Sequence, residues 1–432
     1  MPHFPVVASI ALLSLLSAVP GTAAPAPKAL SPDLRDFYID LHQHPELSLH
    51  EEKTAAKVAD RLRQAGFEVT TGVGGTGVVG VLKNGSGPTV MLRTELDALP
   101  VEEKTGLPYA STVRVKDDAG TEVPVMHACG HDVHMTALVG TAAEMARRKA
   151  DWHGTLVFIG QPAEERIRGA RAMLKDGLFT RFPKPDFVVA LHDTPNLPAG
   201  QLGVTSGYTL ASSDSVDLTI YGKGGHGASP QTTVDPIVIA ARTVLSLQTI
   251  VAREKDPQDP AVVTVGSIHG GNKHNIIPDE VKLQITVRAY KKEVREHILA
   301  AIERIAKAEA AAAGAPKEPA FAVVESCPAT YNDPKLTARI AAALRRTFGD
   351  GNVVDLPPQM ASEDFSEYGL AGVPAVQWSL GAGDPAKLKE LEAAGQHPPS
   401  LHSSLFAPDR DPTIATGVVS EVAVLMDLLG KR

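Results

Sequence analysis

The first half of the chain shows short apolar runs separated by amphipathic stretches. Two of the runs, Thr155–Ile159 and Phe187–Leu191, are apolar almost throughout, which is typical of strands buried on both faces of a parallel sheet. Three further runs have β-like composition, at residues 67–70, 78–82 and 89–92. Helical patterns are expected at residues 31–44 and 51–66 and after Asp132. Because strands alternate with helices, this half predicts an α/β domain with a mixed, largely parallel sheet.

The pattern changes from about Val204. Ser215–Tyr221 alternates polar and apolar residues, as a half-buried antiparallel strand does. Further elements are expected after it, with helices at residues 235–253 and 291–313 and strands at residues 262–268 and 281–290. A helix ending at Phe348 and a buried strand, Val376–Leu380, then return to the earlier pattern. The sequence therefore predicts an α/β domain, residues 28–207 and 323–432, interrupted by a smaller α+β domain, residues 208–322.

A long apolar run lies at the start of the chain, Val6–Val19, and small residues follow it up to Ala24. A membrane-spanning helix needs about 20 apolar residues, so this run is too short for one. An apolar run followed by small residues is typical of a secretory signal peptide, here residues 1–24, although no Lys or Arg precedes the run. We therefore expect an exported protein, secreted or periplasmic, without a membrane anchor.

Composition and charge exclude several classes of protein. The 432 residues are 43% hydrophobic and 21% charged, ordinary globular values that argue against a disordered or fibrous protein. The chain has 42 Lys and Arg against 50 Asp and Glu, which gives a net charge of −8. Proteins that bind nucleic acid usually carry a basic face, so this balance argues against a nucleic-acid partner.

One motif resembles a nucleotide site without being one. Residues 72–77 fit the pattern G-x-G-x-x-G, which binds dinucleotides only where a strand precedes it and a helix opens directly after it. Here an apolar strand pattern, Val78–Leu82, follows instead, so we interpret the glycines as a hairpin turn. The sequence also lacks a G-x-S-x-G nucleophile motif, a Walker loop and an H-E-x-x-H zinc motif.

Acidic and imidazole side chains follow three of the predicted strands. In chain order they are Asp97, the adjacent pair Glu164 and Glu165, and His192. In open α/β sheets, ligands bind beyond the carboxyl ends of the strands, so these groups are expected to gather at one edge. Cys129 and His131 lie in a loop that leads into a helix, and their sulfur and nitrogen atoms are donors that zinc prefers.

Two of these assignments, the Glu164–Glu165 pair and Cys129, each have an alternative interpretation. Outside a helix, adjacent residues such as Glu164 and Glu165 point in different directions, so one carboxylate can bind a metal while the other acts as general base on a water. The alternative is a solvated charge pair. Cys129 either binds metal or forms a disulfide with Cys327, which export would permit. Three histidines lie within five residues of Cys129, and they favour the metal.

In these motifs the chain resembles the M20 metallopeptidase and amidohydrolase family, most of all the subgroup with hippurate hydrolase, N-acyl-amino-acid amidohydrolases and auxin-conjugate hydrolases. The resemblance extends from about Leu34 to the C-terminus. It rests on eight motifs in order: His44–Ser48, Asp97–Pro100, Met126–Asp132, Gln161–Glu165, Gly222–His226, Asn275–Asp279, Ser362–Phe365 and Leu401–Ser403. One departure is Glu95-Leu96-Asp97, where the family usually has Asp-Met-Asp.

The resemblance implies two divalent metal ions per subunit. Zinc is the main expectation, with manganese, cobalt and nickel as alternatives, because the ligand types of these metals overlap. Cys129 would bridge the two ions, and the other ligands would be His131, Glu165, His192 and His402. Glu164 would be the general base, and Asp97 would orient a ligand histidine.

The smaller domain would be the family's lid or dimerisation domain. From it His226 would reach over the site, in a homodimer from the partner subunit, and stabilise the oxyanion. Asn275 and Arg288 would hold the substrate carboxylate. The expected reaction is hydrolysis of the amide of an N-acyl or N-aroyl amino acid, or of a short peptide. The alternatives are a dipeptidase or carboxypeptidase with the same metal site, and a catalytically silent binding protein of the same fold.

Overall fold

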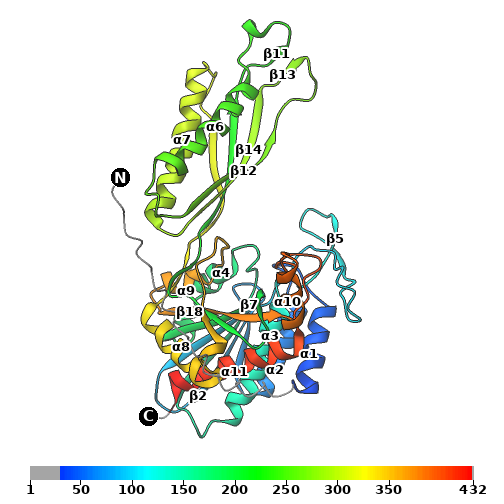
Figure 1. Ribbon diagram of the computed structural model, residues 1–432, viewed down its shortest axis with the longest axis vertical. Coiled ribbons are helices and arrows are strands. Elements are labelled where there is room, and N and C mark those ends of the chain that lie inside the picture. The colour runs from blue at the N-terminus through cyan, green and yellow to red at the C-terminus, as the bar shows by residue number, and fades with distance from the viewer. Residues whose placement is uncertain (1–29, 431–432) are drawn as a thin grey trace, which may run out of the picture.

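A computed structural model describes residues 30–430 (Figure 1). The expected signal peptide, residues 1–24, lies outside the described residues. Two units are visible in Figure 1, a larger one built on a wide sheet and a smaller one that projects from it. The second half of the larger unit follows the smaller one in the chain, as the sequence predicts.

The larger unit is built on an eight-stranded sheet with the order β1-β2-β6-β3-β7-β18-β8-β17. These strands are β1 (Glu68–Val73), β2 (Gly77–Asn84), β3 (Thr89–Glu95), β6 (Gly154–Gln161), β7 (Phe187–Pro198), β8 (Leu202–Val204), β17 (Val353–Asp355) and β18 (Ala375–Gly383). The central strands β6, β3, β7 and β18 are parallel, and β1, β2 and β8 each join an antiparallel pair. The mixed, largely parallel sheet is therefore confirmed.

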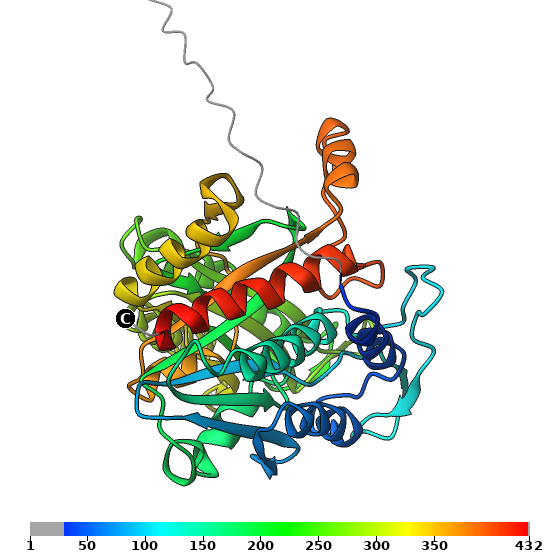
Figure 2. The same ribbon diagram turned by 90° about the horizontal axis from the view of Figure 1, so that it is seen from below.

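Helices cover both faces of this sheet. The lower face carries five helices, seen side by side in Figure 2: α1 (Pro32–Gln43), α2 (Glu52–Gln64), α3 (His131–Arg147), α8 (Pro334–Phe348) and α11 (Arg410–Leu429). Shorter helices pack on the other face: α4 (Gly169–Lys175), α5 (Leu178–Arg181) and α9 (Ser366–Leu370). The strands in between face both layers, so Leu92 and Phe158 join one core while Met91 and Val157 join the other. This explains the continuous apolar runs of the sequence.

The smaller unit, the lid, is a four-stranded antiparallel sheet with two helices on one face. Its order is β12-β14-β10-β15, from β10 (Ser213–Tyr221), β12 (Ala261–His269), β14 (Glu280–Ala289) and β15 (Ala320–Cys327). The helices α6 (Pro236–Arg253) and α7 (Lys292–Ala312) pack on the face that carries Val216, Leu283 and Ile285. At the far end of the lid, β11 (Gly225–His226) pairs with β13 (Ile276–Ile277) (Figure 1).

The boundary expected after residue 322 is wrong. It falls inside β15, which keeps pairing with β10 as far as Cys327. The two-stranded sheet of β9 (Gly207–Leu210) and β16 (Thr330–Asn332) then joins the two units. Because β15 lies at the sheet edge and most of its residues are exposed, its sequence lacks the apolar alternation that would predict a strand.

The hairpin interpretation of residues 72–77 is correct, since Val73 pairs with Gly77 in the antiparallel β1–β2 ladder. No prediction covers the hairpin of β4 (Arg114–Lys116) and β5 (Glu122–Pro124), or the helix α10 (Pro385–Ala393).

Among the described residues, α6 and α11 are long and apolar enough to span a membrane, by length and composition only. The apolar stretch of α11 is 67% buried, against α3 and α8, so a core helix explains it.

Candidate metal centre

The fold brings the predicted metal ligands together at one edge of the large sheet. Glu164 and Glu165 follow the end of β6, and His192 lies on β7, which is separated from β6 by β3. Cys129 and His131 stand at the start of α3, and His402 comes from the loop between α10 and α11. Asp97 follows β3. Parallel strands end at the same edge, so residues from distant parts of the chain meet there.

The donor atoms of these residues lie close to one another. Cys129 Sγ is 3.2 Å from His402 Nε2 and 3.7 Å from His192 Nε2. Glu165 Oε1 is 3.4 Å from His402 Nε2 and 4.0 Å from His131 Nε2. Because metal–ligand bonds to N, O and S are about 2.0–2.3 Å long, ligand atoms spaced in this way can share an ion.

Two orphaned atoms show that the site fits a metal. His131 Nε2 and Glu165 Oε1 are buried, and neither has a hydrogen-bond partner in the described part of the chain. Burial would lower the pKa of His131, but Asp97, Glu95 and Glu165 outweigh it and raise that pKa to about 10. The surroundings thus favour a positive charge at this nitrogen, and a divalent cation supplies one. The donors, one thiol with imidazoles and a carboxylate, are those of zinc and related metals.

The thiol of Cys129 supports the same conclusion. Burial first, and then the charges of Glu165 and Glu164, hold its pKa well above the usual range. A thiolate would therefore be strongly disfavoured here without a cation, whereas a coordinating thiol is deprotonated by its metal. Cys129 and Cys327 are both free, so the disulfide alternative is wrong for this structure. Cys327 is buried at the base of the lid, with Sγ 3.8 Å from Ser366 Oγ.

Backbone carbonyls fix the ring orientation of two of the histidines. His131 Nδ1 donates to the carbonyl oxygen of Asp97 at 2.8 Å, and His192 Nδ1 donates to that of Asp193 at 2.9 Å. In both rings Nε2 is then left as the donor to a metal. Burial and the nearby His134 lower the pKa of His192, which keeps this ring neutral, as a ligand must be.

The carboxylate of Asp97 orients more than a histidine. Its Oδ2 accepts hydrogen bonds from Ser48 Oγ at 2.6 Å and from the backbone N–H of Glu165 at 2.9 Å. Its Oδ1 lies 3.5 Å from His131 Nδ1. Although burial alone would raise the pKa of Asp97, the bonds from His131 and Ser48 lower it below the usual range. Asp97 therefore stays ionised and links two of the candidate ligands.

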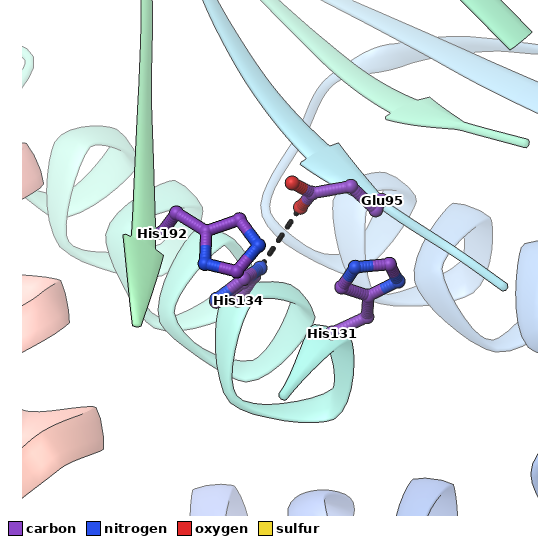
Figure 3. Close-up of side chains that lie close together, drawn as sticks. All are labelled: Glu95, His131, His134 and His192. Carbon is purple, nitrogen blue, oxygen red and sulfur yellow. Dashed lines mark hydrogen bonds and ion pairs between the residues drawn. The ribbon is translucent and has the colours of Figure 1, made fainter. Parts of the chain in front are cut away.

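A buried network of charged side chains lies behind the candidate ligands. His134 lies one turn along α3 from His131, and its ring contacts Glu95 (Figure 3). Its Nδ1 is 2.9 Å from Glu95 Oε2 and its Nε2 is 3.0 Å from Asp193 Oδ1. Burial opposes the charge, but these carboxylates raise the pKa of His134 to about 9. The i, i+3 spacing of the two histidines was the signal that could have pointed to this network.

The network continues to the carboxylates around Glu164. The guanidinium of Arg93 is fully buried and contacts Glu95, Glu363 Oε1 at 2.7 Å and Asp364 Oδ1 at 3.2 Å. One oxygen each of Glu164, Glu363 and Asp364 lie within 4.8 Å of one another. Burial first, and then Glu363 and Glu165, hold the pKa of Glu164 well above its usual range. The carboxyl group of Glu164 therefore favours the protonated form unless a cation is near.

Gly130 shapes the loop that carries Cys129 and His131. It precedes α3 with a φ of +75°, a conformation that residues with a side chain rarely adopt. A Cβ atom at this position would lie 2.4 Å from Asp193 Oδ2. The glycine therefore lets the loop turn close to the carboxylate that holds His134.

The structure does not bring all the predicted residues to this edge. His226 and Asn275 lie at the far end of the lid, on β11 and just before β13 (Figure 1). Arg288, on β14, lines a cavity of about 500 Å³ together with Glu164 and His192, and its Nη1 donates to Ser362 Oγ at 3.0 Å. Within a single chain, the metal site therefore has Arg288 beside it but lacks His226.

A second buried histidine gives a pH prediction. His42 on α1 lies between Asp132, with Nδ1–Oδ2 at 2.6 Å, and Glu103, with Nε2–Oε1 at 3.1 Å. Burial lowers its pKa, but the two carboxylates outweigh this and raise it from 6.5 to about 9. The protonated ring thus stabilises the fold fully below pH 6.5, and this contribution is lost as the pH rises through 9.

We expect His42→Asn to remove that pH dependence. In the wild type, the free energy of unfolding should fall between pH 6.5 and 9 by an amount on the order of a few kcal/mol. Urea unfolding of both proteins at several pH values measures it. Equal slopes of stability against pH in the two proteins would contradict the ion-pair account of His42.

Three comparisons with known proteins bear on this site. The chain matches the model of peptidase family M20/M25/M40 over residues 91–399. It is 39% identical to a hippurate hydrolase of Campylobacter jejuni over 330 residues, covering 76% of this chain and 82% of that protein. It is 36% identical to thermostable carboxypeptidase 1 of Saccharolobus solfataricus over 387 residues, covering 88% and 92% of the two chains.

A solved structure agrees with the observed fold. A dinuclear metal-binding peptidase of the M20 family from Bacillus subtilis superposes with a TM-score of 0.73 at 30% identity, covering 91% of this chain and 97% of that one. The similarity therefore includes the lid as well as the large sheet.

Proposed function

This chain belongs to peptidase family M20/M25/M40, and from that premise we propose that it hydrolyses N-acyl amino acids with Glu164 as the general base. It is a metal-dependent amidohydrolase of the N-acyl amino acid type. The observation that carries the proposal is the meeting of Cys129, His131 and Glu165 with two further histidines beside Glu164, at the end of the parallel strands.

Divalent metal ions belong to this site, and we propose two per subunit, most simply zinc. Cys129 would be shared between them, and the other ligands would be His131, Glu165, His192 and His402. When bound, the ions polarise the substrate carbonyl and acidify the attacking water. Manganese, cobalt and nickel accept similar ligands, so metal analysis must decide among the four.

In this proposal Glu164 moves the proton. Its buried side chain lines the cavity, and its Oε2 atom is 3.9 Å from His131 Nε2. Burial and the neighbouring carboxylates favour its protonated form, while nearby cations would favour the ionised form. These opposing effects bring the carboxyl group towards a pKa at which it can take a proton from water and return it to the leaving amine.

Arg288 is the proposed partner of the substrate carboxylate. It lines the cavity, and it forms no ion pair with any described residue. A guanidinium fork matches a carboxylate well, so the α-carboxylate of the amino acid product is the natural group to bind there. Asn275 would assist it from the lid of the partner subunit.

We propose a homodimer in which His226 of the partner subunit completes the site. In one chain this residue is exposed at the tip of the lid, away from the cavity. The role assigned to it, stabilising the oxyanion that develops during attack, requires a donor at the reacting carbonyl. A second copy can supply this donor if the lids exchange contacts around a two-fold axis.

Export is a further proposal, which rests on the apolar run Val6–Val19 and the small residues after it. Fractionation of cells that produce the full chain, with N-terminal sequencing of the mature protein, tests it. Cleavage near Ala24 and recovery outside the cytoplasm are expected.

A peptidase reaction is the second candidate, because one relative is named a carboxypeptidase. Amino-acid release from N-benzoylglycine, N-acetyl amino acids and dipeptides, with metal-loaded and chelated protein, separates the two. We expect metal-dependent release that is faster from the acyl amino acids than from the dipeptides. Faster release from dipeptides would assign a dipeptidase, and binding without release from any substrate would indicate a silent binding protein.

A further inference from the structure

The sheet of the lid has a polar face that its helices leave open. Along β14, Leu283, Ile285 and Val287 are buried against the helices, so the alternate residues Gln284, Thr286 and Arg288 lie on the opposite, open face. The β-ladders place Ser215 of β10 opposite both Thr286 and Glu325 of β15. Arg288 and Glu325 therefore share the open face, at the end of the lid that meets the metal centre.

These two side chains are opposite charges left unpaired. Both line the cavity of about 500 Å³ that also holds Glu164 and His192. Within residues 30–430, Arg288 bonds to Ser362 Oγ at 3.0 Å and Glu325 accepts a bond from Ser215 Oγ at 3.4 Å, and neither forms an ion pair. They lie two strands and two residues apart on the open face, about 12 Å between Cα atoms, and their side chains do not contact each other.

Glu325 differs from the other carboxylates of the cavity. Those belong to the metal centre or to the ionic network behind it: Glu164, Glu165, Asp193 and Glu363. Bound cations or Arg93 would balance them, whereas Glu325 forms no ion pair with any residue in the described part of the chain. Hydroxyl groups of Ser213 and Ser215 lie between Arg288 and Glu325, so the wall that joins the two charges is polar.

We propose that Glu325 is a specificity-determining residue that selects substrates whose amino acid carries a positively charged side chain. This inference rests on the proposed function. With the α-carboxylate at Arg288 and the amide at the metal centre, the side chain of the amino acid extends along the open face of the lid. A basic side chain reaches Glu325 there, and its alkyl stem crosses the gap between the two charges. Nα-acyl derivatives of basic amino acids are then preferred over those of neutral ones.

The test compares two substrates that differ in one charge. Nα-acetyl-lysine and Nα-acetyl-norleucine share a linear alkyl side chain, and only the first ends in an ammonium group. We expect kcat/KM of the wild type to favour the lysine derivative by about fivefold, since partly exposed ion pairs are of modest strength. In Glu325→Gln this ratio should fall to about one, and 0.5 M salt should weaken the wild-type preference. In Glu325→Lys, Nα-acetyl-glutamate should become the preferred substrate of the three.

Glu318→Gln is the matched control, an exposed glutamate of the lid that does not line the cavity. It should keep the wild-type ratio. A wild-type ratio of one or below, or a ratio that Glu325→Gln leaves unchanged, would overturn the inference while the hydrolase assignment stands. Hydrolysis of none of the acetyl amino acids by metal-loaded wild type would overturn the proposed function, and this inference with it.

Discussion

Glu164→Ala is expected to lower kcat for hydrolysis of an N-acyl amino acid by about 1000-fold. General acid–base groups contribute about 100- to 10,000-fold, and this residue is proposed to serve twice, as base towards water and as acid towards the leaving amine. Its place beside His131 Nε2 and the cavity allows both transfers. Because Glu165 rather than Glu164 is the proposed ligand, the metal content of the variant should stay near that of the wild type.

Steady-state rates and metal analysis of the purified variant measure the two effects separately. Glu421→Gln is a matched control, since Glu421 is also a buried acid whose pKa burial raises, to about 8, but it bonds to Thr141 away from the cavity. It should change kcat far less. A Glu164→Ala protein that retains both metal and rate would remove this residue from the mechanism.

Mixed dimers of two inactive variants are expected to recover activity. Glu164→Ala and His226→Ala should each be strongly impaired alone, for different reasons. In a dimer with one chain of each kind, one site joins an intact Glu164 to an intact His226 of the partner subunit. Random pairing gives half mixed dimers with one working site each, so about a quarter of wild-type activity should return.

Co-expression of the two variants with different affinity tags, followed by purification on both, isolates the mixed dimer. The purified mixed dimer should then have about half the wild-type activity per chain. A matched mixture of Glu164→Ala with Glu165→Ala should stay inactive. Both residues belong to the site of their own chain, so each site of the mixed dimer lacks one of them. Failure of the first mixture, with the dimer intact, would show that His226 does not act across subunits.

The large sheet and the position of the site were predictable because their signals are local. The runs Thr155–Ile159 and Phe187–Leu191 are buried on both faces, so nearly every residue is apolar and the pattern is clear. Polar residues directly after such buried strands are seldom needed for packing, so they indicate a functional site. The positions of Asp97, Glu164 and His192 after such strands therefore predict that the three side chains gather at one edge of the sheet.

The buried network was not predictable in the same way. His134 looks like one more residue of an apolar helix, and its role depends on Glu95 and Asp193, which are 39 and 59 residues away in the chain. The side chain of Glu95 reaches this ring through a contact that only the fold defines. The end of β15 was missed for a related reason, since an exposed edge strand has no buried face to impose a pattern.

Titration of the metal-free protein with zinc tests the central claim most directly. Hydrolysis of an N-acyl amino acid is followed while zinc is added in known equivalents. The account predicts no activity at the start and a rise that ends at about two ions per chain, with Cys129→Ala unable to follow it. Full activity without metal, or a folded protein that binds none, would contradict the assignment of this site.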